Sequence, residues 1–295
     1  MSITTRALTK HYDDVTALDA VDLEIRSGAI TGLLGRNGAG KSTLLALAAG
    51  FDRPTSGEIL VDGEDPFDNA VTMADTQLVR EGGDVFDTEK VRDTFAYYAD
   101  LREHWDADAA RSLADAFELD VQQKVAHLSR GQTSMVGAII GLAARAPITL
   151  LDETYIGMDA PNRQTFYDAL LADYAAHPRT IVISSHLISE VERMFEDVVI
   201  LDAGRVLVAG DADDVRAGGL SLTGRASDLE RLVGTREVLA RRDLGPTAQL
   251  TVRTAAGDDG ATLAALAREQ GIDVGGVSLQ DLFVDLTRRS PKEES

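Results

Sequence analysis

The sequence predicts an α/β protein in which a mostly parallel sheet is flanked by helices and followed by a smaller α/β appendage. Three observations predict this fold class. A glycine-rich loop joins an apolar strand to an apolar helix within residues 30–50. The runs ITLLDE and RTIVISSH are short, apolar and β-branched, as strands buried in parallel sheets are. From residue 216 on, strand and helix patterns begin again on their own.

The first strands are predicted from the alternation of apolar and polar residues. ITTRALTKHY and VTALDAVDLEI alternate in this way, and a turn at Ser27–Gly28 leads into the apolar run AITGLLG. The segment STLLALAAG predicts a helix that ends at Gly50, and PTSGEILVDGED predicts a hairpin.

The middle of the chain changes to a helical pattern. KVRDTFAYYADL and DADAARSLADAFEL place apolar residues at positions i, i+3 and i+4, which predicts amphipathic helices. The chain then alternates between strands and helices again, with ITLLDE, RTIVISSH, the helix ISEVERMFEDV and the strands of VVILDAGRVLVAG.

The C-terminal part predicts a small domain of its own. Its strand and helix signals follow in the order β-α-β-β-α-β, which indicates a ferredoxin-like appendage, and LQDLFVDLTRR adds a final helix. The last residues, PKEES, are predicted to be disordered. The chain is therefore expected to divide into residues 1–215 and an accessory domain at 216–295.

The composition argues against several classes of function. A formal net charge of −20 disfavours nucleic acid and anionic lipid as direct partners, because both carry charge of the same sign. The chain has no cysteine, so it has no disulfide framework and no thiolate metal site. Its longest apolar run, Val136–Ala144, is too short to span a bilayer, so direct bilayer insertion is not expected.

The most specific local signal is GRNGAGKST, at Gly35–Thr43. It satisfies the P-loop pattern G-x-x-x-x-G-K-[ST] between an apolar strand and an apolar helix, where backbone N–H groups converge on phosphate oxygens. Lys41 is expected at the β- and γ-phosphates of ATP and Ser42 on Mg²⁺. The expected ATP-binding residues of this loop are Gly35, Asn37, Gly38, Ala39, Gly40, Lys41, Ser42 and Thr43.

Two further apolar strands end in residues that fit ATP hydrolysis. ITLLDE delivers Asp152, expected to bind Mg²⁺ through water, and Glu153, expected to orient the attacking water. RTIVISSH ends at His186, on the edge of the sheet where ligands bind in such folds. Taken alone, His186 is better explained as a surface residue. The paired carboxylates behind a P-loop predict hydrolysis rather than binding alone.

The pentapeptide LSRGQ, at 128–132, precedes an apolar helix and is open to two interpretations. Ser129 and the backbone N–H groups around Gly131 form a helix start that attracts anions. In the first interpretation this start is only a helix cap. In the second it contacts a nucleotide held by another chain.

Taken together, these motifs resemble those of the ATP-binding subunit of ABC transporters. GRNGAGKST is similar to the family's Walker A loop, ITLLDE to its Walker B strand, LSRGQ to its LSGGQ signature, and GMD at Gly157–Asp159 to its D-loop. His186 stands at the switch histidine, and Tyr12 stands where the family stacks an aromatic ring on adenine. The resemblance covers about residues 1–215, and the stretch of about 86–145 matches the family's inserted helical subdomain.

The resemblance implies a P-loop NTPase core with an antiparallel β subdomain, an inserted helical subdomain and the small C-terminal appendage. It also implies a head-to-tail homodimer, or a heterodimer with a related ATP-binding subunit, in which each ATP lies between the Walker loops of one chain and the signature of the other. Glu153 and His186 would be catalytic, and Asp159 would lie in the D-loop. The residues implied to contact the partner's ATP are Ser129, Arg130, Gly131 and Gln132.

Two positions depart from the family's pattern. The family begins the loop to the helical subdomain with Gln, and counting back from Phe86 that place is held by Glu81. Glu81 is expected to be a modified Q-loop residue and a ligand of Mg²⁺, whereas Gln77 is predicted on the preceding strand. The Walker B strand continues with Thr154 and Tyr155 where the family has Pro. Both departures bear on the rate of hydrolysis and on its coupling.

The implied function is an ATPase that drives substrate movement through separate transmembrane permease subunits. Such a subunit is cytoplasmic and peripheral on the cytoplasmic face of the cell membrane. The ending SLQDLFVDLT resembles the SLEDVF-type ending of exporter-type ATPases and favours export. The alternative is a slowly hydrolysing ATP-dependent clamp or interaction protein, which Glu153 argues against and Glu81 and Thr154 leave open. The net charge disfavours a nucleic-acid ABC ATPase.

Overall fold

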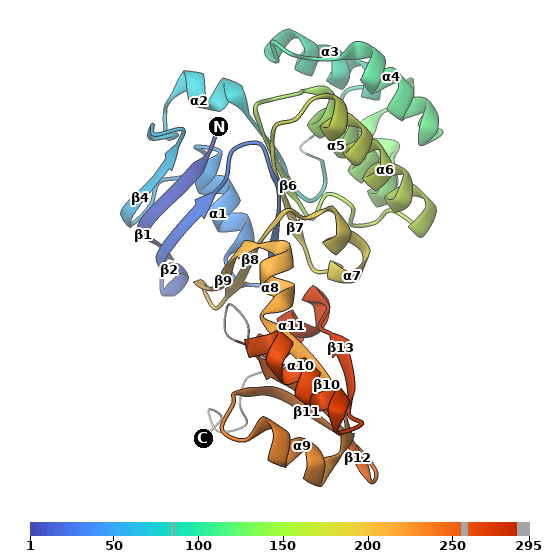
Figure 1. The fold of residues 1–295 in the computed structure, drawn as a ribbon. Coiled ribbons are helices and arrows are strands. Elements are labelled where there is room, and N and C mark those ends of the chain that lie inside the picture. The colour runs from blue at the N-terminus through green and yellow to red at the C-terminus, as the bar shows by residue number, and fades with distance from the viewer. Residues whose placement is uncertain (84, 86, 255–258, 288–295) are drawn as a thin grey trace. The chain divides into compact units, whose positions relative to one another are not determined.

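A computed structural model describes residues 1–83, 85, 87–254 and 259–287, so Phe86 and the PKEES tail lie outside the described residues. The chain divides into two compact units, whose elements are labelled in Figure 1. The first consists of Met1–His186 and Leu201–Val206, and the second of Leu187–Ile200 and Leu207–Ser295. The domain boundary predicted at residue 215 falls within the short helix α8 (Ala212–Ala217).

The first unit begins with a three-stranded antiparallel sheet of order β2-β1-β4. Its strands are β1 (Ile3–Tyr12), β2 (Val15–Ile25) and β4 (Ser56–Val61). The hairpin predicted for PTSGEILVDGED is an isolated bridge between Val61 and Glu64 in the described structure. Strand β4 pairs along β1 instead, with Val61 opposite Ile3, because its buried side chains then face the same interior as those of β1.

The core sheet has six strands in the order β5-β6-β7-β3-β8-β9. The pairs β5–β6, β6–β7 and β7–β3 are parallel, and every residue of these four strands is buried, as their apolar runs predict. Because parallel strands end at the same edge, the loops after β3, β6 and β7 meet there. The strands are β3 (Ile30–Gly35), β5 (Thr76–Val79), β6 (Ile148–Asp152), β7 (Thr180–Ser185), β8 (Asp197–Asp202) and β9 (Arg205–Asp211).

Helices surround this sheet in the first unit, and α3 and α4 pack on α5 in the helical segment (Figure 1). Helix α5 begins with a capping box: Ser129 Oγ accepts from the backbone N–H of Gln132 at 3.2 Å, and Gln132 Oε1 accepts from the N–H of Ser129 at 2.9 Å. The helices are α1 (Lys41–Ala48), α2 (Ala70–Asp75), α3 (Val91–Leu101), α4 (Ala107–Ala116), the 3₁₀ helix η1 (Val125–His127), α5 (Arg130–Ala143) and α6 (Ala160–Ala176).

The second unit contains the β-α-β-β-α-β order that the sequence predicts, in an antiparallel sheet of order β11-β12-β10-β13. This strand order is ferredoxin-like. Its elements are β10 (Gly219–Arg225), α9 (Ala226–Val233), β11 (Val238–Leu244), β12 (Thr247–Arg253), α10 (Asp259–Glu269), β13 (Asp273–Gly276) and α11 (Leu279–Leu286).

The segment ISEVERMFEDV in the second unit is not the single α-helix that the sequence predicts. It forms α7 (Ile188–Val191) and then the 3₁₀ helix η2 (Glu192–Met194). The buried side chains Ile188, Val191 and Met194 recur every third residue, which matches the three-residue turn of a 3₁₀ helix.

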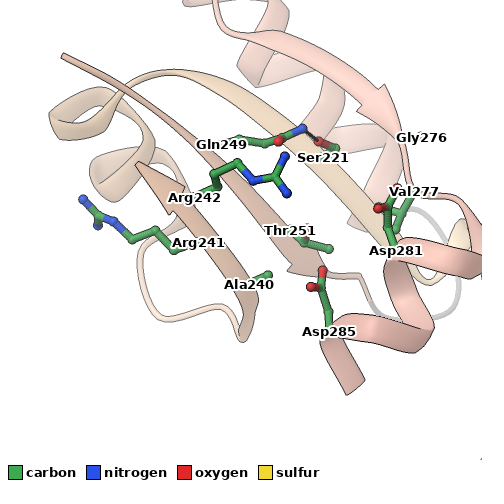
Figure 2. A pocket seen from close by; sticks show the side chains of 10 residues that line it. All are labelled: Ser221, Ala240, Arg241, Arg242, Gln249, Thr251, Gly276, Val277, Asp281 and Asp285. Carbon is green, nitrogen blue, oxygen red and sulfur yellow. Dashed lines mark hydrogen bonds between the residues drawn. The ribbon is translucent and has the colours of Figure 1, made fainter. Parts of the chain in front are cut away.

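The sheet of the second unit has two different faces, because successive side chains of a strand point in opposite directions. Leu222 and Leu250 lie on the face that packs against helices α9 and α10. Their neighbours Ser221 and Gln249 lie on the other face and line a polar pocket of about 220 Å³, together with residues of α11 (Figure 2). Within the described residues, no helix has the length and apolar character needed to cross a membrane.

Candidate functional site

Most of the sequence-predicted site residues line one pocket of about 530 Å³ in the first unit. The P-loop forms part of its wall, and the loops after β6 and β7 bring in one carboxylate and one imidazole. These loops meet because β6, β7 and β3 are neighbours in the parallel sheet. The lining residues are Val15, Ala17, Asn37, Gly38, Ala39, Gly40, Lys41, Ser42, Thr43, Glu81, Arg130, Glu153, Ile156 and His186.

The P-loop has a conformation that requires glycine at position 40. Gly40 has φ of 104°, and a Cβ there would lie 2.4 Å from the carbonyl oxygen of Ala17 and 2.8 Å from Cδ2 of Leu18. Helix α1 begins at Lys41, and no side chain caps its N-terminus in the described structure. Its first backbone N–H groups are therefore left for an anion such as a phosphate.

Lys41 is held inside the pocket wall by the loop itself. The residue is 6% exposed, and its Nζ donates to the carbonyl oxygen of Gly35 at 2.8 Å. The same Nζ lies 3.6 Å from Oε1 of Glu153. A buried ammonium group needs compensating partners, and this arrangement holds Lys41 beside the predicted phosphate-binding loop.

Ser184 contacts both acidic residues at the end of β6, Asp152 and Glu153, and sequence reasoning missed it. Its Oγ donates to Oδ1 of Asp152 at 2.5 Å and accepts from the backbone N–H of Glu153 at 3.0 Å. Ser184 lies directly opposite Asp152 in the β6–β7 register. Glu153 has φ of 51°, a left-handed conformation that is costly for a residue other than glycine and that clusters at functional sites.

Tyr155 joins Glu153 to His186 through a hydrogen-bond network that sequence reasoning did not assign. Its hydroxyl donates to Oε2 of Glu153 and accepts from the backbone N–H of His186 at 3.1 Å. Nδ1 of His186 lies 2.8 Å from the same Oε2 and 3.2 Å from the Tyr155 hydroxyl. Burial, followed by the hydrogen bond to Glu153 and its charge, raises the pKa of Tyr155, so its hydroxyl keeps its proton and remains a donor.

The residues at the predicted Q-loop and signature positions, Glu81 and Arg130, contact each other. A guanidinium nitrogen of Arg130 pairs with Oε1 of Glu81, and both side chains are about half exposed. This pairing places a positive charge beside the extra negative charge that Glu81 brings to the pocket. The role of Glu81 as a ligand of Mg²⁺ stays a prediction.

The start of α5 lies close against the loop that leads to the D-loop. A Cβ at Gly131 would lie 2.4 Å from the carbonyl oxygen of Gly157, so glycine is required at this approach. Asp159 Oδ1 accepts from the backbone N–H of Asn162 at 3.0 Å and caps helix α6. The predicted signature and D-loop segments are therefore neighbours within one chain.

Several predicted residues stand outside the described lining of the pocket. Tyr12 is 43% exposed, and its hydroxyl donates to Oδ2 of Asp52 at 2.8 Å. Burial, followed by the hydrogen bond to Asp52, raises the pKa of Tyr12. Its stacking on adenine stays a prediction. The other predicted residues outside the lining are Gly35, Ser129, Gly131, Gln132, Asp152 and Asp159.

The donors in and behind the pocket fit Mg²⁺ bound together with a nucleotide. Mg²⁺ takes one or two protein oxygens and completes its shell with phosphate oxygens and water. Ser42 lies in the lining, and Asp152 ends β6 next to Glu153, which also lines the pocket; Ser42 and Asp152 would hold the ion. Among the described residues, His, Asp and Glu side chains form no group of three or more that is arranged to hold a metal.

Comparisons with known proteins identify the family. The profile of the ABC transporter family matches residues 18–155. The chain is 32% identical over 201 residues to the aliphatic sulfonates import ATP-binding protein SsuB of Shigella flexneri, covering 68% of this chain and 77% of that protein. It is 30% identical over 220 residues to the sulfate/thiosulfate import ATP-binding protein CysA of Mesostigma viride, covering 73% of this chain but 63% of that longer protein.

A solved structure shares the fold. It is a dimeric ATP-binding cassette in a post-hydrolysis state bound to ADP and Pi, with a TM-score of 0.62 and 21% identity over 71% of this chain and 98% of that one. The fold and the pocket thus define an α/β protein with a P-loop NTPase core, as the sequence predicts. The chain belongs to the ATP-binding ATPases of the ABC transporter family.

Proposed function

We propose that this chain is the motor subunit of an ABC transporter, which binds and hydrolyses ATP as a dimer and drives substrate through separate permease subunits. The observation that carries the proposal is the meeting of Lys41, Glu153 and His186 in one pocket behind a P-loop. A protein that bound ATP without turning it over would have no need of a buried carboxylate held between a lysine and a histidine.

Residues of the site have separate proposed roles in hydrolysis. Ser42 and Asp152 would hold Mg²⁺, which would supply positive charge beside the γ-phosphoryl group of ATP. The backbone N–H groups of the P-loop and Lys41 bind the phosphates. Glu153 orients the attacking water through Oε1. Because Nδ1 of His186 faces Glu153, its other ring nitrogen is left for a phosphate oxygen.

The signature residues support a head-to-tail dimer. Ser129 and Gln132 cap α5 and stand outside the pocket of their own chain, whereas Arg130 between them lies in its lining. Each chain carries one P-loop and one LSRGQ segment. We therefore propose that the start of α5 contacts ATP held by a second chain, either identical or related, and that residues 1–215 form the ATP-binding domain.

The helical segment offers a surface for a permease. A cavity of about 320 Å³ lies between α3 and α4, with Phe95, Trp105 and Leu119 in its walls. Apolar walls of this kind suit an inserted loop or short helix of a membrane subunit. Docking there would hold the protein at the cytoplasmic face of the membrane, as a peripheral subunit.

Export remains our proposed direction of transport, on the strength of the ending SLQDLFVDLT, which forms the N-cap and body of α11. Both relatives described above are named for import, which favours the opposite direction. Their matches leave about a quarter to a third of this chain uncovered.

The substitution Glu153→Gln tests the proposed function. The full-length wild type should hydrolyse Mg-ATP, and the variant should be slower by about 100-fold or more, the usual contribution of a general base. Glu103→Gln, on an exposed turn, is the matched control and should retain the wild-type rate. Equal rates for the wild type and Glu153→Gln, with ATP-driven dimerisation intact, would favour the slowly hydrolysing clamp instead.

A further inference from the structure

Tyr155 is a large polar residue buried at the turn after β6. Its side chain is 2% exposed, and its ring centre lies 5.9 Å from that of His186 and 6.4 Å from that of Tyr167. Burying a tyrosine hydroxyl to this extent costs free energy unless hydrogen-bond partners replace the lost water. The partners that the fold supplies are the groups proposed for catalysis.

The hydroxyl of Tyr155 has one proton and two lone pairs, and the structure accounts for how they are used. The proton goes to Oε2 of Glu153, because this carboxylate is an acceptor. One lone pair accepts from the backbone N–H of His186, and Ser185 Oγ lies 3.0 Å away. The raised pKa of Tyr155 keeps the proton on the phenol, so the group acts as a fixed donor and not as a base.

Glu153 is therefore held by one of its two oxygens. Oε2 receives the Tyr155 hydroxyl and faces Nδ1 of His186 at 2.8 Å. Oε1 makes neither of these contacts and lies 3.6 Å from Nζ of Lys41. A carboxylate fixed in this way cannot rotate freely, and its second oxygen stays directed into the pocket that Lys41 lines.

We propose that Tyr155 is a positioning residue of the ATP site, which holds Glu153 and His186 in one arrangement and leaves Oε1 of Glu153 to orient the attacking water. The inference rests on the proposed function and deepens it. Tyr155 is buried, and its hydroxyl is engaged by Glu153 and the backbone of His186, so we expect it to act on hydrolysis through these two residues. Its loss should therefore affect the rate of hydrolysis more than the binding of ATP.

The substitution Tyr155→Phe removes the hydroxyl and keeps the ring. We expect kcat for ATP hydrolysis to fall by about 10- to 100-fold, because small displacements of a catalytic group have effects of this size, while KM for ATP stays within about threefold. Tyr167→Phe is the matched control, since Tyr167 is similarly buried beside Tyr155, and it should retain the wild-type kcat. An unchanged kcat in Tyr155→Phe, or equal losses in the two variants, would overturn the inference.

A second readout does not depend on turnover. In nucleotide-free protein labelled with ¹⁵N-histidine, the His186 signals are assigned by their loss in His186→Ala. Tyr155→Phe should shift the Nδ1 signal of His186, because the variant loses the hydroxyl 3.2 Å away, and Tyr167→Phe should leave it in place. Identical His186 signals in the wild type and Tyr155→Phe would contradict the arrangement.

The two readouts separate this inference from the proposed function. If the wild type hydrolyses ATP no faster than Glu153→Gln, the proposed function fails, and the His186 signals still decide whether Tyr155 holds the histidine. If the wild type hydrolyses ATP and Tyr155→Phe matches it, the positioning role alone fails. A lower melting temperature with unchanged kcat would mean that Tyr155 is only a packing residue.

Discussion

The two units each contain a polar pocket, and the pockets differ in how they hold charge. In the nucleotide pocket, Lys41 and Glu153 are nearly buried and lie within 3.6 Å of each other. In the pocket of the second unit, shown in Figure 2, Arg241 and Arg242 are exposed. Arg241 pairs with Glu230 and Asp243 on the surface, at 2.7 and 2.9 Å.

This difference in burial indicates that the charges of the nucleotide pocket serve a chemical function. Burying a charge is costly, and removing one member of a buried pair costs about 3–5 kcal/mol. Exposed pairs contribute about 0–1 kcal/mol each. The nucleotide pocket therefore retains charges that stability alone does not favour, whereas the second pocket holds exposed charges of the kind that protein surfaces commonly carry.

The largest effect is expected at Lys41. Lys41→Ala removes the ammonium group that serves the phosphates and leaves Glu153 buried without it, so ATP affinity should fall by about 30-fold or more. Titration calorimetry of the nucleotide against the full-length chain measures the change. An affinity within threefold of the wild type would contradict the conclusion that the buried charges of the nucleotide pocket serve ATP binding.

The N-cap residues Ser129, before α5, and Ser278, before α11, provide a second comparison between the two units. Ser129→Arg should abolish ATP-driven dimerisation and leave folding and ATP binding by the monomer intact. The matched control is Ser278→Arg at the N-cap of α11, where Ser278 Oγ accepts from the backbone N–H of Asp281. It should cost about 1 kcal/mol of stability and leave dimerisation unchanged. If Ser129→Arg still dimerises and hydrolyses ATP normally, LSRGQ is only a cap.

A smaller effect is expected from the half-exposed pair of Glu81 and Arg130. Glu81→Gln removes a negative charge from the nucleotide pocket, so KM for ATP should fall by about two- to fivefold, as expected for one partly screened charge. Arg130→Ala should raise KM by a similar factor. Steady-state kinetics at low and high salt measures both, and a higher KM in Glu81→Gln would contradict this account of the pair.

The smallest effect is expected in the second pocket. Arg242→Ala and Asp281→Asn should each leave ATP hydrolysis unchanged and alter the free energy of unfolding by no more than about 0.5 kcal/mol, as exposed substitutions do. Thermal unfolding and steady-state kinetics check this. A change in hydrolysis of more than twofold would show that the second pocket acts on the first.

The sequence predicted the parts of the site that are local in the chain. The P-loop, the carboxylates of Asp152 and Glu153, and His186 each stand at the C-terminal end of an apolar run, and the neighbouring strands β6, β7 and β3 bring them together in the structure. Ser184 was missed because its role depends on standing opposite Asp152 in the register of two strands. Tyr155 was noted as a departure from the family pattern, but its contacts with Glu153 and His186 arise only from tertiary structure.

Dependence on tertiary structure also explains where the observed fold differs from the predicted one. The pairing of β4 with β1 and the 3₁₀ turn after α7 are decided by which neighbour covers the apolar side chains. Local pattern does not contain this information. By contrast, the order of strands and helices in the second unit was predicted well, because alternation and helical periodicity are local properties.

The most direct test of the account is the mass of Glu153→Gln in solution, measured by light scattering with and without Mg-ATP. Because Glu153→Gln is expected to slow hydrolysis, we expect a stable dimer of twice the chain mass in Mg-ATP, and a monomer with ADP or without nucleotide. A monomer in saturating Mg-ATP that nevertheless binds the nucleotide would contradict the central claim, that two chains close around ATP through the P-loop of one and LSRGQ of the other.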